Sequence, residues 1–476
     1  MTRHAPPTPR GIVLRRIDVL RACCDVRLTI GDYDRALADA VAALAAATAC
    51  GEATVQADCL MLQGRAHCGH SRFAEMERCA RQALALARAR GDHSDQAAAL
   101  NNVAMSLAYR GAYRPALDAL VEALSLHQRI DDADGRAYTL GNIGFVQNAL
   151  GDSEAALTHH RQSLALRQQL GEIREQATSL DNIGTALFKL GDPRQALAHY
   201  QESLRLRMEI GDRTGQATCL NNIGYLRQLA GDFRGTLDCY RRALRLRQET
   251  GDRAGHALVL QNIAILNGQL GDHRQALAQS EQALAARSEL GDRSGAAYSH
   301  IAVARLLTEQ GGEERRAARH LDAAAAIAAQ IDEPEVGLRI AGARTELALA
   351  RWDAAVAVGH LGEARQLAGR LRSKQGRAQV ALLQARTDAM RGRTGPAATG
   401  FREAIALYEE LRQAFEAAKA RLCYAEFLAG NGERAVAQEH LDTAAAFFAR
   451  IGNRTYLERI ERARLGGAAR DGAGQN

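Results

Sequence analysis

The amino-acid sequence predicts an all-α fold, an α-solenoid of about eleven antiparallel helical hairpins, because a fixed period of this length is typical of solenoids. The tripeptide Asn-Ile-Gly recurs every 40 residues, beginning at positions 142, 182 and 222. Gly-Asp pairs interrupt the chain at a regular spacing within these units. Apolar residues make up 47% of the 476 residues but aromatic residues only 4%, and alanine dominates. This composition suits closely packed helices, whereas a β-sheet core would need more valine, isoleucine and aromatic residues.

Each unit of the repeat is expected to be a helical hairpin. In the unit around position 222, the apolar residues recur with helical spacing: Leu220, Ile223, Leu226, Leu229, Leu237, Leu244 and Leu246. Gly231-Asp232 separates the first helix of this unit from the second, and Gly251-Asp252 separates the second helix from the next unit. Glycine supplies the left-handed residue that ends one helix, and aspartate can cap the start of the next.

The same register predicts how the chain is organised. Less regular units precede the clear ones, marked by Gly31 and Gly91, and others follow, with breaks at Gly392 and Gly432. The predicted segments are a disordered basic arm (1–13), irregular N-terminal units (14–96), a regular array (97–330), irregular C-terminal units with a capping helix (331–465) and a flexible tail (466–476).

The residues within one unit resemble a known repeat. A first helix with Leu-x-Asn-Ile-Gly, a Gly-Asp turn, and a second helix with Ala196-Leu197 followed by Tyr200 resemble the tetratricopeptide repeat. Small residues such as Gly184 would let paired helices approach closely. The period is longer than the usual length of about 34, and is similar to that of Pins-type scaffolds, kinesin light chain and bacterial signalling arrays. The family's closing proline is absent, and Gly211-Asp212-Arg213 takes its place. The resemblance implies a right-handed superhelix whose first helices line the concave side.

Five asparagines stand in register, one in each regular unit: Asn102, Asn142, Asn182, Asn222 and Asn262. The resemblance implies that this position faces the groove, where such asparagines often hold the backbone of an extended peptide. A carboxamide offers donors and an acceptor that match the alternating N–H and C=O groups of such a ligand. Alternatively, each asparagine bonds a neighbouring helix and sets the stacking of the hairpins. The series stops at Leu62 and Ala302 although the fold pattern continues, which favours binding.

Further first-helix residues are expected on the same groove. Those predicted to bind a peptide are Tyr138, Phe145, Asn148, Phe188, Asn221, Tyr225 and Gln228, and Tyr109 is expected beside them. Only Asp181 and Lys189 among the expected groove positions are charged. Co-chaperone members of the family clamp a carboxylate with lysine and arginine here, and nucleic acid also needs such residues, so both ligands are disfavoured. The predicted partner is a protein or an extended peptide with apolar side chains. The aromatic residues could alternatively fill space between hairpins.

Charge and hydropathy bear on the other classes of partner. The formal net charge of +6 is small for 476 residues and gives little support for nucleic acid or an acidic membrane. The longest apolar runs, such as Val41–Ala47, are much shorter than the roughly 18 residues of a membrane-spanning helix. The N-terminal apolar stretch, Ile12–Leu14, is too short for a signal peptide. We therefore expect a soluble, cytoplasmic protein with no nucleic-acid or membrane partner and an unknown oligomeric state.

No metal, cofactor or catalytic site is predicted. The nine cysteines include no CxxC pair, and Cys59 shares its repeat position with Cys219 and with small residues of other units, which indicates packing. Free thiols in this number fit a reducing compartment. Neither a GxxxxGK[ST] nor an HExxH motif occurs. In the segment Gly291–Gly295, Ser294 stands one position later than the serine of a GxSxG nucleophile elbow, so we interpret this segment as a turn. The protein is therefore predicted not to be an enzyme.

A column of arginines also follows the repeat. It occupies a late position in each second helix: Arg167, Arg207, Arg247 and Arg287. A cation there meets the negative end of the helix dipole. We expect a solvated face that stabilises helix ends, or alternatively a surface for an acidic partner.

These observations lead to two hypotheses about function. The first is a non-enzymatic scaffold that binds an extended peptide or a partner protein in the concave groove. The second is a sensory or regulatory module that controls a separate signalling chain, such as a cyclase, a kinase or a transcription regulator. An adaptor for RNA or membrane is disfavoured by the modest net charge.

Overall fold

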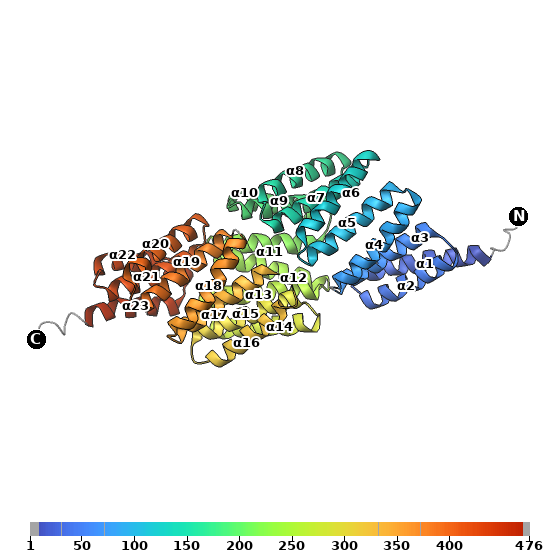
Figure 1. Cartoon of the computed structure of the whole chain (residues 1–476). Coiled ribbons are helices and arrows are strands. Elements are labelled where there is room, and N and C mark those ends of the chain that lie inside the picture. The colour runs from blue at the N-terminus through green and yellow to red at the C-terminus, as the bar shows by residue number, and fades with distance from the viewer. Residues whose placement is uncertain (1–8, 30, 71, 332, 372, 470–476) are drawn as a thin grey trace, which may run out of the picture. The chain divides into compact units, whose positions relative to one another are not determined.

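The computed structural model describes residues 9–469, except residues 30, 71, 332 and 372. The described residues form 23 α-helices and no strand, as the sequence predicts (Figure 1). The chain divides into two compact units, residues 1–190 and residues 191–476. Each unit is described by itself below.

The first unit contains the helices up to the one that carries the second Asn-Ile-Gly tripeptide. They are α1 (Pro9–Thr29), α2 (Tyr33–Ala49), α3 (Ala53–Gly69), α4 (Phe73–Arg90), α5 (His93–Tyr109), α6 (Tyr113–Arg129), α7 (Ala133–Leu150), α8 (Ser153–Leu170) and α9 (Ile173–Lys189). Helices α1 to α8 form four hairpins, and α9 packs on α8 as the first helix of the next pair. The first helices also contact one another, α1 with α3, α3 with α5, α5 with α7 and α7 with α9, so that they form one continuous layer.

The second unit contains the rest of the described chain. Its helices are α10 (Pro193–Glu209), α11 (Arg213–Leu229), α12 (Phe233–Glu249), α13 (Arg253–Leu270), α14 (His273–Glu289), α15 (Arg293–Gln310), α16 (Glu314–Ala328), α17 (Pro334–Ala350), α18 (Ala354–Arg370), α19 (Lys374–Met390), α20 (Thr394–Glu410), α21 (Ala414–Gly430), α22 (Arg434–Ile451) and α23 (Arg454–Ala469). Helices α11 to α22 form six hairpins, and α23 packs on α21 and α22. With α9 and α10 as one pair in chain order, the chain has the eleven pairs that the repeat predicts.

Two predicted boundaries are wrong at the ends of the chain. The arm expected to be disordered over residues 1–13 is helical from Pro9 onward, because the apolar stretch there continues the helical pattern of α1. Helix α23 reaches Ala469 and so includes residues 466–469 of the segment expected to be a tail. Residues 1–8 and 470–476 lie outside the described part of the chain.

The Asn-Ile-Gly glycines Gly144 and Gly224 lie where the second helix of the hairpin leaves no room for a Cβ atom. A Cβ atom at Gly224 on α11 would lie 2.7 Å from the ring of Tyr240 on α12, which is fully buried. At Gly144, a Cβ atom would lie 2.5 Å from the ring of His160, whose pKa burial lowers to about 4. In the hairpin of α5 and α6, by contrast, the same two repeat positions hold the larger Ala104 and the smaller Leu120. A large ring on the second helix therefore stands opposite glycine, and a smaller side chain on the second helix stands opposite alanine.

The arginine column is buried, which corrects the expectation of a solvated face or a surface for an acidic partner. The four arginine side chains are exposed by 3–8% only. Arg207 Nη1 donates to Asp212 Oδ2 over 2.8 Å, while Asp212 Oδ1 accepts from the backbone N–H of Gly215 over 3.0 Å. The same aspartate thus caps α11 and binds the end of α10. Arg247 pairs with Asp252 in the same way at the start of α13. The column links consecutive hairpins.

The last helices of the second unit return to its earlier ones. Phe233, at the start of α12, lies near Phe415 of α21 and Phe447 of α22, with ring centroids 6.4 and 6.3 Å apart. Asn453, which precedes α23, donates from Nδ2 to the carbonyl oxygen of Gln269 in α13 over 2.9 Å. The hairpins of this unit therefore coil until both ends meet, so that the layer of first helices encloses an interior.

Gly224→Ala is expected to destabilise the second unit by about 2 kcal/mol, because the added methyl group overlaps the buried Tyr240 ring. The double variant Gly224→Ala/Tyr240→Leu should recover part of this loss, since it reproduces the pair found in α5 and α6. Urea denaturation followed by circular dichroism measures both changes. A double variant no more stable than Gly224→Ala would contradict the size-matching explanation.

Arg207→Ala is expected to lower stability by about 3 kcal/mol, because it leaves the buried carboxylate of Asp212 without its ion pair. Hydrogen exchange should then accelerate in α10 and α11. The control is Arg205→Ala, which removes an exposed arginine from the same helix and should leave the exchange unchanged. Equal exchange in both variants would show that the buried pair does not hold the junction.

Candidate functional site

In the first unit, the predicted asparagine ladder is half-buried on the layer of first helices. Asn102 donates from Nδ2 to the carbonyl oxygen of Ala98 in its own helix, over 3.0 Å. Asn142 donates from Nδ2 to Oδ1 of Asn101 in the preceding hairpin, over 3.1 Å. Asn182 stands one unit later, where the position equivalent to Asn101 is Gly141. Asn182 therefore lacks the side-chain acceptor in the preceding hairpin that Asn142 has.

In the second unit, the ladder makes the same contact between hairpins. Asn262 donates from Nδ2 to Oδ1 of Asn221 over 2.7 Å, across 41 positions of the chain. Asn221 in turn lies 3.5 Å from Oδ1 of Asn222. The bonds of Asn142 and Asn262 are those expected if the asparagines set the stacking of hairpins. Because both side chains are also partly exposed, stacking and binding are compatible roles for this position.

Exposed aromatic rings accompany the asparagines in the first unit. Tyr138 and Phe145 are 52% and 43% exposed and lie on the face of α7 that carries Asn142, because their positions differ from it by about one helical turn. Phe145 is 6.4 Å from the ring of Tyr109 on α5, which is 4.9 Å from the ring of Phe73 on α4. The rings of Phe73, Tyr109 and Phe145, here called the aromatic ridge, cross three consecutive hairpins.

Two of the predicted groove residues are instead buried between the helices of their own hairpins. Asn148 lies 3.5 Å from Nε2 of His160 on α8. Gln228 accepts from the hydroxyl of Tyr240 on α12 over 2.9 Å. Both positions lie six residues after the ladder asparagine of their helix, about one and two-thirds turns, so their side chains point away from the groove face and toward the second helix. Phe188 and Tyr225 are half-buried, and Asn221 contacts the ladder as described above.

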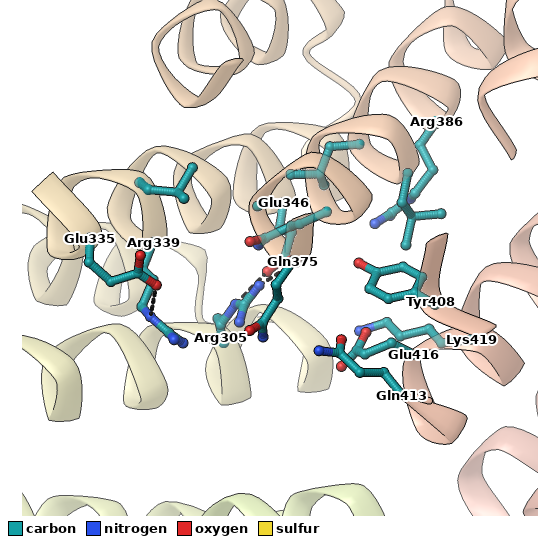
Figure 2. Close-up of a pocket in the computed structure, with 15 residues that line it drawn as sticks. Arg305, Glu335, Arg339, Glu346, Gln375, Arg386, Tyr408, Gln413, Glu416 and Lys419 are labelled. Carbon is teal, nitrogen blue, oxygen red and sulfur yellow. Dashed lines mark hydrogen bonds and ion pairs between the residues drawn. The ribbon is translucent and has the colours of Figure 1, made fainter. Parts of the chain in front are cut away.

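A second candidate site, which the sequence did not predict, lies inside the second unit (Figure 2). It is a cavity of about 70 Å³ between α15, α17, α19, α20 and α21. Its polar lining residues are Arg305, Glu335, Arg339, Glu346, Gln375, Gln379, Arg386, Tyr408, Gln413, Glu416 and Lys419. Figure 2 shows Tyr408, Gln413, Glu416 and Lys419 together on one side, with the Arg305–Glu346 and Arg339–Glu335 pairs across from them.

Ion pairs satisfy part of this lining. The guanidinium of Arg305 binds both carboxylate oxygens of Glu346, each over 2.9 Å. Burial alone would raise the pKa of Glu346, but the charges of Arg305, Lys419 and Arg386 and the hydrogen bond from Arg305 together outweigh it, so that the pKa is lowered. Nε of Arg339 lies 3.3 Å from Glu335. Lys419 lies 3.7 Å from Glu309 of α15, at the edge of the cavity.

Glu416 has the opposite pKa shift. Burial raises its pKa, and the charges of Lys419 and Arg305 lower it by less, so the net shift is upward. Burial also raises the pKa of Tyr408 well above its ordinary value. Strongly perturbed groups that share a cavity are typical of functional sites.

A single signal in the sequence could have indicated this cavity. The repeat positions of Arg305 and Glu309 hold Ile265 and Gln269 one unit earlier, so the first helices change from neutral to charged. The other lining residues belong to units whose register is too irregular for such a comparison, and only the coiling of the second unit brings them together.

A family model described as "Tetratricopeptide repeat" matches residues 95–169, 135–209, 175–249 and 215–289. Together these matches span residues 95–289. The matched repeats contain the whole asparagine ladder, whereas Arg305 and the other cavity residues lie beyond them. A comparison with curated proteins found no match.

Three solved structures illustrate what the chain is similar to. A Rap conjugation gene regulator of the plasmid pLS20, in complex with the Phr* peptide, has a TM-score of 0.53 at 14% identity, over 73% of this chain and 97% of that one. A signal transduction ATPase with a tetratricopeptide-repeat sensor from Pyrococcus horikoshii has a TM-score of 0.49 at 15% identity, over 71% of this chain and 52% of that one. BtubC from P. vanneervenii has a TM-score of 0.36 at 21% identity, over 42% of this chain and 91% of that one. The likeness to the Rap regulator shows the fold alone.

The described residues were also examined for membrane and metal sites. None of the helices in the described ranges is long and apolar enough to cross a membrane. Within the same ranges, no three side chains of histidine, cysteine, aspartate or glutamate gather where they could hold a metal ion. All nine cysteines are free thiols.

Glu416→Gln is expected to make the protein more stable at neutral pH. Because the folded-state pKa of Glu416 is raised, its ionised form destabilises the fold, and this cost grows as the pH rises through that pKa. The gain should therefore be present at pH 7 and vanish below about pH 4, where glutamate is protonated in both states. Thermal melts of both proteins across this range measure the difference. A gain that is constant with pH would exclude ionisation of Glu416 as its cause.

Proposed function

We propose that the chain is a non-enzymatic scaffold for protein–protein interaction, which binds an extended peptide segment of a partner on the first helices of its regular repeats. The observation that carries the proposal is the aromatic ridge, in which the exposed rings of Tyr109 and Phe145 lie on the first helices of two consecutive hairpins that also carry ladder asparagines. Exposed aromatic side chains are typical anchors of protein interfaces.

The chemistry of this face suits a peptide with apolar side chains. Asn102, Asn142 and Asn182 follow one another at the repeat spacing, and each offers amide groups to a peptide backbone. The rings of Tyr109, Tyr138 and Phe145 offer apolar area for its side chains. In the second unit, the proposed contacts are Asn221, Asn222, Asn262 and Tyr225, and in the first unit Phe188 joins the ridge residues. The Rap regulator that shares the fold holds a peptide, but the proposal for this chain rests on its own residues.

Asn182 offers the cleanest test of the ladder. Asn142 bonds the preceding hairpin, so replacing it changes stacking and binding together. At Asn182 the equivalent acceptor is missing because residue 141 is glycine. A loss of binding in Asn182→Ala with unchanged stability therefore separates the two roles.

Peptides selected on the wild-type protein from a display library of random linear peptides should bind Asn182→Ala and Phe145→Ala about tenfold more weakly. This factor corresponds to the loss of about one hydrogen bond or one apolar contact. Isothermal titration calorimetry measures the affinities, and circular dichroism checks that the variants are folded.

Two matched controls lie away from this face. Asn431→Ala removes an amide that bonds only its own turn, and Val121→Ala removes an apolar side chain exposed by 57% on the second helix α6. Both should bind the selected peptides as the wild type does. If the library yields no binder, or if all four variants bind equally, the first-helix face is not the binding surface.

A further inference from the structure

Several polar side chains around the cavity of the second unit have no hydrogen-bond partner among the residues that the structure describes. Tyr408 and Gln413 are only 3% and 4% exposed, and no hydrogen bond joins either side chain to another described residue. Nε2 of Gln379 is likewise buried without a partner in the described chain. Most buried polar groups in proteins are paired, so unpaired groups that share one cavity require an explanation.

The charges around the cavity are also incompletely paired. Arg305, Arg339 and Lys419 each face a glutamate, as described above. Arg386 and Glu416 remain, and neither forms an ion pair or hydrogen bond with another described residue. Figure 2 shows them on opposite sides of Tyr408. One positive and one negative group are thus left over, at separate places in the lining.

Solvent satisfies such groups while it fills the cavity, and a ligand that replaces the solvent has to offer matching groups. A molecule with one cationic and one anionic group would complement the two unpaired charges. Between these groups, hydrogen-bonding atoms such as those of an amide would complement the carboxamides of Gln375, Gln379 and Gln413. A volume of about 70 Å³ holds about five water molecules, at the roughly 10–15 Å³ that each one needs, so the enclosed part of the ligand is small.

We propose that this cavity binds a small zwitterion, whose ammonium group pairs with Glu416 and whose carboxylate pairs with Arg386. Free α-amino acids and short peptides with free termini share this chemistry. The glutamine carboxamides and the Tyr408 hydroxyl bind the part of the ligand between its two charges. The site shares no residue with the asparagine ladder, so the two proposals stand or fall separately.

The coiling of the second unit supports a binding role for the cavity. Its walls come from α15 and α17 on one side and from α20 and α21 on the other. The hydroxyl of Tyr456 on α23 binds Glu309 on α15, and Lys419 on α21 faces the same carboxylate. The last helices therefore hold the cavity in shape through charged side chains, so a ligand meets preorganised groups.

Saturation-transfer NMR on the full-length protein tests the proposal. The probes are the natural amino acids, their dipeptides with alanine, and the same dipeptides with acetylated amino and amidated carboxyl ends. At least one zwitterion should give transfer, and its blocked analogue should give none. Transfer from free amino acids alone identifies an amino-acid site, and transfer from dipeptides alone identifies a peptide-terminus site.

Arg386→Gln and Glu416→Gln should each weaken binding of that zwitterion by about tenfold or more, since each removes a charge-assisted pair. Arg377→Gln on α19 and Glu403→Gln on α20 are exposed matched controls and should bind as the wild type does. Asn182→Ala should also leave this binding unchanged, which separates it from the proposed peptide face.

Three results would overturn the proposal. They are no transfer from any zwitterion, equal transfer from the blocked dipeptides, and unchanged binding in both Arg386→Gln and Glu416→Gln. Loss of the fold does not confuse the test, because Glu416→Gln removes a carboxylate that burial disfavours, and melting curves verify that the variant is folded.

Discussion

The aspartate that caps the first helix at the regular junctions between hairpins, as at Asp212, Asp252 and Asp292, is the group on which the rest of this structure depends. In Asp212, one carboxylate oxygen accepts the backbone N–H of Gly215 and the other binds the buried guanidinium of Arg207. A single side chain thereby starts one helix and fixes the end of the helix before it. A Cβ atom at Gly215 would lie 1.9 Å from the guanidinium of Arg207, so glycine at this position makes room for the arginine. Because the junction recurs at the repeat spacing, it sets the angle at which successive first helices present their side chains.

The asparagine ladder shows how one residue type serves both stacking and surface chemistry. Asn142 and Asn262 bond side chains of the preceding hairpin, and such bonds explain why asparagine recurs with the repeat even without a ligand. A carboxamide that uses one donor in this way still has further donor and acceptor capacity. The ladder therefore aligns the hairpins and keeps amide groups on the same face as the aromatic ridge.

The second unit departs from the regular repeats in both charge and shape. Its later first helices carry arginine, lysine and glutamate at positions facing its interior, and these residues pair across helices that are distant in sequence, as Tyr456 and Glu309 do. Charged groups in such an interior are costly unless paired, so their retention points to a role beyond packing. This is also the part of the chain that the family model leaves unmatched.

The sequence by itself determined the helices, the hairpins and their number, because the spacing of Asn-Ile-Gly and of Gly-Asp is a local property that survives without tertiary context. It also placed the ladder asparagines and Phe145 on the first-helix layer, since residues about one turn apart share a helix face. It misplaced Asn148 and Gln228, whose positions differ from that face by a fraction of a turn that only the packed second helix decides. It read the arginine column as solvated, because burial depends on the neighbouring hairpin.

The interior cavity was decided by tertiary structure alone. Arg386 and Glu416 come to line one space because the first helices α19 and α21 of neighbouring hairpins pack on each other, at an angle that no local pattern of residues specifies.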